Sequence, residues 1–440
     1  GISWRFEALR GEDPTAAMLD EAVGDVPVLL DANDLHSVWV NTAALSALGI
    51  TDDTPDPVGG EIRRDAEGRA TGFLLEAAAM RYGWSYLESS ATEADRDRYL
   101  ANAFDAYLAT GVTTATEMAL NEADLAVFER FLDREGQLPF PMTANVILHP
   151  TGDGAEALSQ VARAAELRDR LERRFAEAPF GDGTLRITGV KFVLDGVIDA
   201  CTAAMRAPFA DGSHPDTIWP RDAAIAAAVA ADAQGLQLAL HAIGDAASDL
   251  ALDMVEACLR EHGPREGRRP RIEHLESVAP DTIRRMAALG VTASMQPVHC
   301  DPAIMDNWIA LLGDERATEG FPWHRFRDAG VRIAIGTDAP TAPHEAPHNL
   351  FIALTAKSVL EASRAPYAAE RVFTPADALE AMTLGSAVAA GVDSEVGALV
   401  PGARANFIVL DTNPFVDSPE TLLGTEVRMT VVNGEVRHSR

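Results

Sequence analysis

The chain has 440 residues, which is too long for one small domain. Its hydrophobic share of 47% is enough for a large core. A net charge of -30 argues against nucleic acid and anionic membranes as partners, and no run of 18 uncharged apolar residues indicates a membrane span. The cysteines at 201, 258 and 300 form no metal or redox motif, which favours a reducing compartment, most simply the cytoplasm.

A small β-rich insert is predicted over residues 26–76. The segment PVLLDANDLHSVWVN is typical of a strand followed by a turn. GGEIRRDAEGRATGFLLE predicts a hairpin around Asp65–Gly68.

From about residue 100 onward, helical and strand-like stretches alternate. Helices are predicted over Arg96–Thr110, Gly154–Ala178, Pro220–Gln234, Ala246–His262 and Pro280–Leu289. Short apolar runs predict strands over Val112–Met118, Thr143–Leu148, Leu185–Leu194, Leu236–His241, Pro270–His274, Val291–Gln296 and Val331–Thr337. This alternation predicts an α/β fold of parallel βαβ units, and seven strands fall one short of a closed, TIM-like (β/α)8 barrel.

The tail, roughly Val396–Arg440, is again β-rich, with Asn433–Gly434 as a hairpin turn. It predicts a small β domain packed on the barrel. The expected division is therefore residues 1–78 with the insert, 79–395 as the barrel and 396–440 as part of a β-sandwich.

Four side chains lie at or near the ends of predicted strands. Lys191 lies within ITGVKFVLDG, while His241 closes LQLALH, His274 closes RIEH and Asp338 closes IAIGTD. The carboxyl ends of barrel strands surround one cavity, and two imidazoles with a carboxylate suit zinc or a similar ion. Each residue alone has a plainer interpretation as a hydrogen-bonded, turn or surface residue, but the joint pattern favours a metal site.

Lysine is rare in this chain. Only Lys191 and Lys357 occur among 37 basic residues, so arginine has been favoured wherever a positive charge suffices. Unlike arginine, lysine can lose its proton and react at nitrogen. Lys191 is thus a candidate for chemistry, whereas Lys357 lies in a helical stretch and is expected at the surface or a helix end.

Several motifs together resemble the amidohydrolase superfamily, in particular the branch called amidohydrolase family 3 or YtcJ-like. They are DLHSVWVNTAAL, GGEIRRDAEGRATGFLLE, GVTTATEM, VKFVLDG, HAIGD, RIEHLE, SMQPVH, IAIGTDAP and, in the tail, GALVPGARANFIVLDTNPF. The resemblance covers nearly the whole chain. It implies a hydrolase acting on a small amide-type molecule, with a homodimer as one expected assembly.

The resemblance also implies a metal centre with assigned residues. Two divalent ions, commonly zinc, share a hydroxide and a lysine that CO2 has converted to a carbamate, here Lys191. His241 and His274 would hold the second ion. Asp338 would bind the first ion, take the proton of the attacking water and deliver it to the leaving nitrogen.

Other residues have weaker claims on the site. His36 and His299 match or follow positions near the substrate pocket, and a structural role is equally expected for each. Asp195 is expected to shape the loop beside Lys191 or to form a plain turn. Arg316 is a candidate for the pocket lining, with a surface position as its alternative. Asp245 is a candidate for orienting His241.

The chain departs from the family pattern at its start. The family's first strand ends in a His-x-His pair that binds the buried metal, and no two of the 11 histidines here are separated by one residue. We therefore expect a longer native polypeptide. With only Lys191 and Asp338 for the first metal, the chain as written is expected to bind metal poorly and to be nearly inactive.

Three functions are left open. The first is a binuclear hydrolase of C–N bonds in amides, formamides or cyclic amides. The second is a mononuclear deaminase on the same barrel, against which Lys191 argues because such deaminases usually lack the bridging lysine. The third is a catalytically inactive binding or regulatory protein. The number of bound metals separates the three.

Overall fold

A curled parallel sheet of seven strands forms the centre of the computed structural model, which describes residues 1–2, 4–9, 12–33 and 35–440. Its order is β11-β10-β9-β8-β7-β6-β5. The strands are β5 (Ala115–Leu120), β6 (Met142–Ile147), β7 (Leu185–Val193), β8 (Gln237–Ala242), β9 (Arg271–His274), β10 (Thr292–Met295) and β11 (Ile333–Ile335). All seven predicted strands are confirmed, and their sequential order is that of a TIM-type barrel wall.

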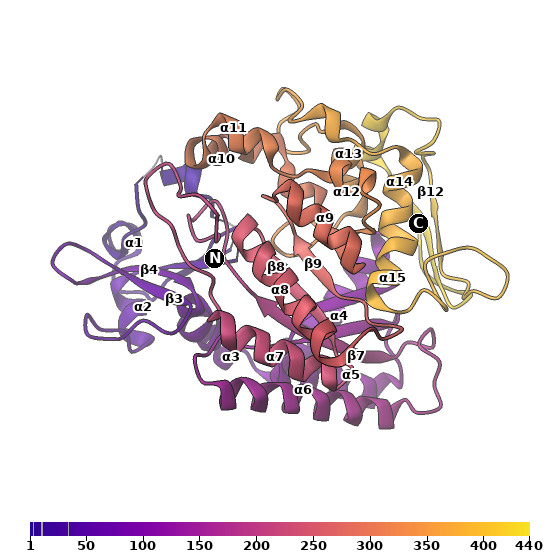
Figure 1. Cartoon of the computed structure of the whole chain (residues 1–440), viewed down its shortest axis with the longest axis horizontal. Coiled ribbons are helices and arrows are strands. Elements are labelled where there is room, and N and C mark those ends of the chain that lie inside the picture. Colours follow the sequence, from indigo (N-terminus) through magenta and orange to yellow (C-terminus); the bar gives the residue numbers. More distant parts are fainter. Residues whose placement is uncertain (3, 10–11, 34) are drawn as a thin grey trace.

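Helices between the strands cover the outer face of this sheet (Figure 1). They are α4 (Glu93–Ala109), α5 (Glu122–Glu135), α6 (Gly154–Arg174), α7 (Arg221–Ala233), α8 (Asp245–His262) and α9 (Pro280–Leu289). The five predicted helices are confirmed, and α5 lies outside the predicted set. On α6, buried Val161, Ala164 and Leu171 recur at helical spacing, so one face of the helix packs on the sheet.

The later part of the chain adds shorter helices around β10 and β11. They are α10 (Met305–Leu312), α11 (Asp314–Glu319), α12 (Trp323–Asp328), α13 (Ala346–Thr355), α14 (Pro375–Glu380) and α15 (Ser386–Ala390). Trp308 and Trp323 are buried there with Phe326. These aromatic side chains belong to the main hydrophobic core of the chain.

The predicted β-rich insert is a separate antiparallel sheet on one side of the barrel, drawn in indigo in Figure 1. Its strands β1 (Leu29–Asp31), β2 (Ser37–Val40), β3 (Gly60–Arg64) and β4 (Ala70–Glu76) pair in the order β1-β2-β4-β3, with α1 (Ala16–Val23) and α2 (Thr42–Ala47) beside them. Val38, Ile62 and Leu74 form its own core. The hairpin around Asp65–Gly68 is confirmed.

The tail forms a second small antiparallel sheet, which lies opposite the insert in Figure 1. Its strands β12 (Phe407–Leu410), β13 (Val427–Val432) and β14 (Glu435–Ser439) pair in that order. Asn433 and Gly434 have φ of 52° and 80°, as a two-residue hairpin turn requires. The hydroxyl of Thr430 donates to the Leu108 carbonyl (2.7 Å) and attaches the sheet to α4.

Within the described residues, no helix is both long enough and apolar enough to cross a membrane. The three cysteines have no disulfide partner.

Candidate metal centre

Parallel strand register brings the four predicted metal ligands to one end of the sheet. Val193 pairs with His241, two residues after Lys191, and Ala242 on β8 pairs with His274 on β9. The ring centroids of His241 and His274 are 4.4 Å apart. His299 connects this pair with Asp338, since its ring centroid is 5.7 Å from that of His274 and its Nε2 is 3.6 Å from the Asp338 Oδ2. The four side chains therefore share one space.

Burial keeps both central histidines neutral. His241 and His274 are 4% and 7% exposed, and loss of solvent lowers the pKa of each well below its ordinary value. The positive charge of Lys191 also lowers the pKa of both histidines. A neutral imidazole keeps a lone pair on one ring nitrogen, which is the form that binds a divalent metal. This donor set fits the expected ion.

Lys191 is buried as well, at 6% exposure. Burial lowers the pKa of its ammonium, while the carboxylates of Glu273 and Asp338 raise it and only partly offset that effect. Glu273 is held by Arg271, whose Nη2 lies 3.1 Å from the Glu273 Oε2. A lysine poised to be neutral fits the carbamate chemistry, because only an uncharged amine can capture CO2.

Gln296 holds His274 in a metal-binding orientation. The Nδ1 of His274 lies 2.9 Å from the Oε1 of Gln296. An amide oxygen only accepts hydrogen bonds, so Nδ1 carries the proton and the lone pair of Nε2 is left for an ion. Gln296 follows β10 in SMQPVH, and no pattern of residue types marked it beforehand.

Replacing Gln296 by leucine is therefore expected to weaken metal binding without removing a ligand. Outer hydrogen-bond partners of metal-bound histidines typically contribute about 10- to 100-fold in affinity, and a loss in this range is expected. Zinc titration against a competing chelator measures it. Exposed Gln137 provides the control, since Gln137→Leu should leave zinc affinity unchanged. An unchanged affinity in Gln296→Leu would contradict the orienting role.

His299 lies between two carboxylates beside the same cluster. Its Nδ1 is 3.2 Å from the Oε1 of Glu276, and its Nε2 is 3.6 Å from the Oδ2 of Asp338. Burial lowers the pKa of His299, but the hydrogen bond to Glu276 and the charge of Asp338 outweigh it and raise the pKa overall. Ligand atoms of His274, Glu276 and His299 all lie within 4.8 Å of one another. Glu276, in RIEHLE, was not anticipated.

Two residues of the site have left-handed backbone conformations. His274 has a φ of 75° and Asp338 a φ of 56°. Such conformations cost roughly 1–3 kcal/mol for residues with a side chain, and they persist where the surrounding structure enforces them. For Asp338, the hydroxyl of Thr341 donates to Oδ2 (3.1 Å) and also to the Asp338 carbonyl. The strained backbone conformations thus occur at two residues that are expected to bind metal or to catalyse the reaction.

Asp195 lies behind His241 rather than on the surface of the site. Its side chain is fully buried and accepts the backbone amides of Ile243 (3.0 Å), Gly244 (2.8 Å) and Ala204 (3.0 Å). Its Oδ1 is 3.6 Å from the His241 Nε2. Burial raises the pKa of Asp195 to about 8 in spite of these amides. The carboxyl group fixes the loops after β7 and β8 and has no surface for a substrate.

Asp245 was a candidate for orienting His241, but its described side-chain hydrogen bond is to another residue. The Asp245 Oδ1 accepts the amide of Arg206 at 2.7 Å. Asp195 is the carboxyl group beside His241 instead. His36, in contrast, is brought to the cluster, with its ring centroid 5.0 Å from that of His241.

Comparison with known proteins agrees with this geometry. The model of the amidohydrolase family matches residues 8–438. This chain belongs to the amidohydrolase family. An amidohydrolase, YtcJ, of Bacillus subtilis is 27% identical over 96% of this chain and 76% of its own length. An N-substituted formamide deformylase of Arthrobacter pascens is 29% identical over 100% of this chain and 79% of its own.

A solved structure shares the fold of this amidohydrolase. The crystal structure of a metal-dependent hydrolase from Pyrococcus horikoshii superposes with a TM-score of 0.68 at 27% identity, covering 96% of this chain and 78% of that one. The expected family and the TIM-type α/β fold are thereby confirmed. The protein is a metal-dependent hydrolase acting on carbon–nitrogen bonds.

Arg316 of the amidohydrolase has structural contacts. Its Nε donates to the Leu312 carbonyl (2.9 Å) and its Nη1 to the Ala207 carbonyl (3.1 Å). These bonds connect α10 and α11 with the loop before α7. None of the described contacts of Arg316 reaches the histidine cluster, so its place in the pocket stays a prediction.

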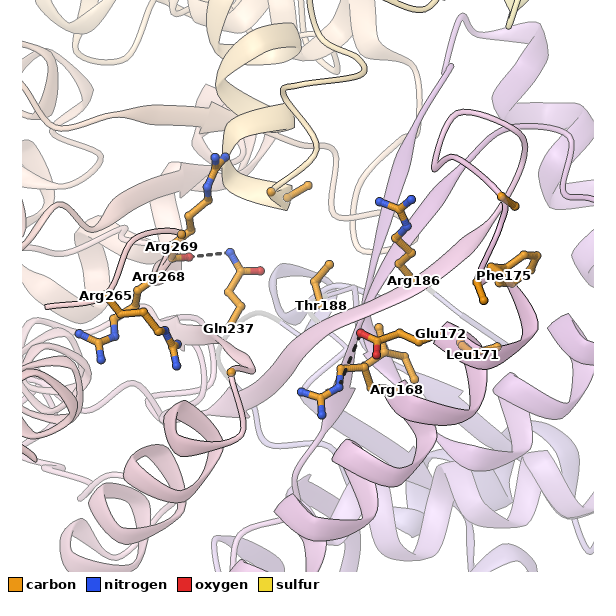
Figure 2. A pocket seen from close by; sticks show the side chains of 17 residues that line it. Arg168, Leu171, Glu172, Phe175, Arg186, Thr188, Gln237, Arg265, Arg268 and Arg269 are labelled. Atoms are coloured by element: carbon orange, nitrogen blue, oxygen red, sulfur yellow. Dashed lines mark hydrogen bonds and ion pairs between the residues drawn. The ribbon is translucent and has the colours of Figure 1, made fainter. Parts of the chain in front are cut away.

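A cavity of about 570 Å³ lies at the opposite, N-terminal end of the strands, as Figure 2 shows. It is lined by five arginines, at 168, 186, 265, 268 and 269. Each of them has a carboxylate within ion-pair distance, at Asp169, Glu395, Asp232 or Asp393. The positive charges are thus balanced within the protein, and the cavity lies away from the expected chemistry of the amidohydrolase.

Proposed function

We propose that the amidohydrolase cleaves the C–N bond of a small amide, formamide or cyclic amide with two divalent ions, most simply zinc. The supporting observation is the convergence of Lys191, His241, His274 and Asp338 at the carboxyl ends of their strands. His241 and His274 would hold one ion, and Asp338 the other. Lys191, as a carbamate, would bridge them. When bound, such ions lower the pKa of a water molecule and polarise a carbonyl group.

The side chains of the protein move the proton. Asp338 accepts the proton of the attacking water and delivers it to the leaving nitrogen, because an amine anion is too poor a leaving group to depart unprotonated. The hydroxyl of Thr341 and the imidazole of His299 lie on its Oδ2 side and restrict its rotation. Burial of His241 and His274 excludes water and keeps both available as neutral ligands.

The chemical class of the substrate follows from this proton path. The substrate needs only a carbonyl carbon bonded to nitrogen. N-substituted formamides are the first compounds to test, because the Arthrobacter pascens relative is named for them. N-acyl amino acids and hydantoin-like rings have the same reacting group. A mononuclear deaminase is the alternative, and the His274–Glu276–His299 group is compatible with a single ion.

Metal analysis of the protein expressed from its complete coding sequence tests the proposal. Two equivalents of metal are expected, with activity on the panel of formamides, acyl amino acids and cyclic amides. Dialysis against a chelator should abolish that activity, and added zinc should restore it. One equivalent with deaminase activity would support the alternative. A protein without metal or activity would contradict both.

A further inference from the structure

An apolar pocket lies between the β-rich insert and the carboxyl ends of β6 and β7. Ile147 and Val193 line it from these two strands. Ala77, directly after β4, and Met80, in the short helix η2 (Ala79–Trp84), line it on the side of the insert. The loops after β6 and β7 contribute the remaining lining residues, Leu148, His149, Pro150 and Ile218. All of these except the histidine are apolar, so the pocket suits an apolar group rather than a charged one.

Strand register places this pocket next to two of the proposed metal ligands. Ile147 pairs with Lys191, and Val193 pairs with His241. Side chains paired across neighbouring strands point to the same face of a sheet, about 5 Å apart. The residues on either side of Ile147 and of Val193 belong to the main hydrophobic core under the helices. Because side chains alternate along a strand, Ile147 and Val193 therefore face the barrel interior together with Lys191.

The pocket is small, and its walls are held in place. Its volume is about 10 Å³, close to the room that one water molecule needs. The Ile218 amide donates to the Leu194 carbonyl (2.8 Å), and the Ala77 amide donates to the Gly59 carbonyl (3.3 Å). Gly59 has a φ of 74°, and a Cβ at this position would lie 2.4 Å from the Ile218 side chain. The insert thus packs directly against Ile218, and the pocket accepts little more than a hydrogen atom or a methyl group.

The position of Asp338 decides which part of a substrate meets this pocket. In the proposed function Asp338 delivers a proton to the leaving nitrogen, so that nitrogen lies on the β11 side of the mouth. β7 is four strands away from β11 in the sheet, which in an eight-stranded barrel is the opposite side. The acyl group is bonded to the carbonyl carbon on the side away from the nitrogen. It therefore points towards β6 and β7.

From this arrangement we infer that the pocket binds the acyl group of the substrate and limits it to formyl or acetyl. The inference rests on the proposed function and narrows its substrate class to N-formyl and N-acetyl compounds. Cyclic amides fit poorly, because a ring joins their acyl carbon to the nitrogen and cannot place the two on opposite sides of the mouth. Met80 and Ile218 determine this specificity, since they line the pocket from outside the sheet.

Anilides that differ only in the acyl group test the inference in the metal-loaded protein. Formanilide and acetanilide should have a kcat/KM at least about 10-fold above that of butyranilide, since one methylene group in an apolar pocket changes this constant by about 10- to 200-fold. Met80→Ala and Ile218→Ala enlarge the pocket from two separate elements. Each should raise the ratio of the butyranilide kcat/KM to the formanilide kcat/KM by about 10-fold or more.

Met429 provides a matched control, because it is a half-buried methionine of β13 in the tail sheet. Met429→Ala should keep the wild-type ratio. A binding measurement needs no turnover. In calorimetry, butyrohydroxamic acid should bind the zinc-loaded wild type at least about 10-fold more weakly than acetohydroxamic acid, and the two affinities should converge in Met80→Ala. Metal content should be the same in all variants, since none of them replaces a proposed ligand.

The outcomes separate this inference from the proposed function. A metal-loaded wild type that hydrolyses the three anilides equally well, or that hydrolyses only cyclic amides, would overturn the acyl pocket alone. Wild-type ratios in both Met80→Ala and Ile218→Ala would overturn the assignment of these two residues. A wild type without metal, or without activity on any amide, would overturn the proposed function and this inference with it.

Discussion

Replacing Lys191 with arginine is expected to lower kcat/KM by at least about 10³-fold and to remove bound metal. The guanidinium keeps its proton under all conditions in which the protein is folded, so it can neither capture CO2 nor donate a lone pair to an ion. It would also place a fixed charge beside two imidazoles whose neutral form is needed. The expected loss corresponds to about 4 kcal/mol, the scale of metal-assisted stabilisation of a transition state.

Lys357 provides the matched control for that substitution, because it is the only other lysine of the chain. It lies just after α13, and its Nζ is 2.6 Å from the Oε1 of exposed Glu420. Lys357→Arg keeps this surface ion pair and should leave metal content and kcat/KM unchanged. Metal analysis and steady-state kinetics on both variants check the prediction. A Lys191→Arg protein with full metal content and activity would contradict the assignment of Lys191 as a ligand.

Removing the carboxylate of Asp232 is expected to have the largest effect on stability. Asp232, near the end of α7, is 2% exposed and accepts from the Nε of Arg268 (2.7 Å), the Nη2 of Arg265 (2.9 Å) and the Nδ1 of His262 (2.7 Å). Asp232→Ala leaves the mostly buried Arg268 without its counter-charge, and such a loss destabilises by about 3–5 kcal/mol. Arg265 is more exposed and regains water, so it contributes little.

The effect of Asp232→Ala should depend on pH in a defined direction. Burial raises the pKa of Asp232, but the hydrogen bonds from Arg268 and His262 outweigh burial and hold the pKa below its ordinary value. A lowered folded-state pKa gives stability that is complete above the unfolded-state pKa, about 3.9, and is lost as pH falls through the folded-state pKa. The difference between wild type and variant should therefore be full at pH 7 and shrink below about pH 4.

Urea denaturation followed at several pH values measures these free energies of unfolding. Asp222, exposed at the start of the same helix, is the control, and Asp222→Ala should cost no more than about 1 kcal/mol. Equal losses in the two variants, or a difference that grows towards acid pH, would contradict the ion-pair explanation.

Much of the candidate site could be read from the order of residues along the chain. VKFVLDG, HAIGD, RIEHLE and GTDAP each place a ligand type at or near a strand end, and parallel strands bring such ends together. The hydrogen-bond partners of those ligands could not be predicted from the sequence in the same way. Gln296 and Glu276 become recognisable only once β9 and β10 are adjacent, because any glutamine or glutamate near a strand has the same local signal.

The contribution of the insert shows the same division between local pattern and tertiary contact. Its strands and its hairpin follow from alternating residues and from the turn at Asp65–Gly68. The contacts of Glu76 with His36 and with the loop at Gly196 depend on how a separate sheet packs on the barrel. No short-range sequence pattern predicts that packing. Asp195 is a further case, since an aspartate after a strand predicts a turn, whereas here it is fully buried among amides from its own loop after β7 and from the loop after β8.

The sequence by itself determined the family, the alternation of strands and helices and the residue types at the strand ends, because these depend on local spacing and on the chemistry of single side chains. Only the tertiary structure decided which groups meet: His36 with His241, Gln296 with His274, and His299 between Glu276 and Asp338. The reason is physical. Hydrogen bonds and pKa shifts arise from atoms a few ångströms apart, and in a barrel those atoms belong to residues far apart in the chain.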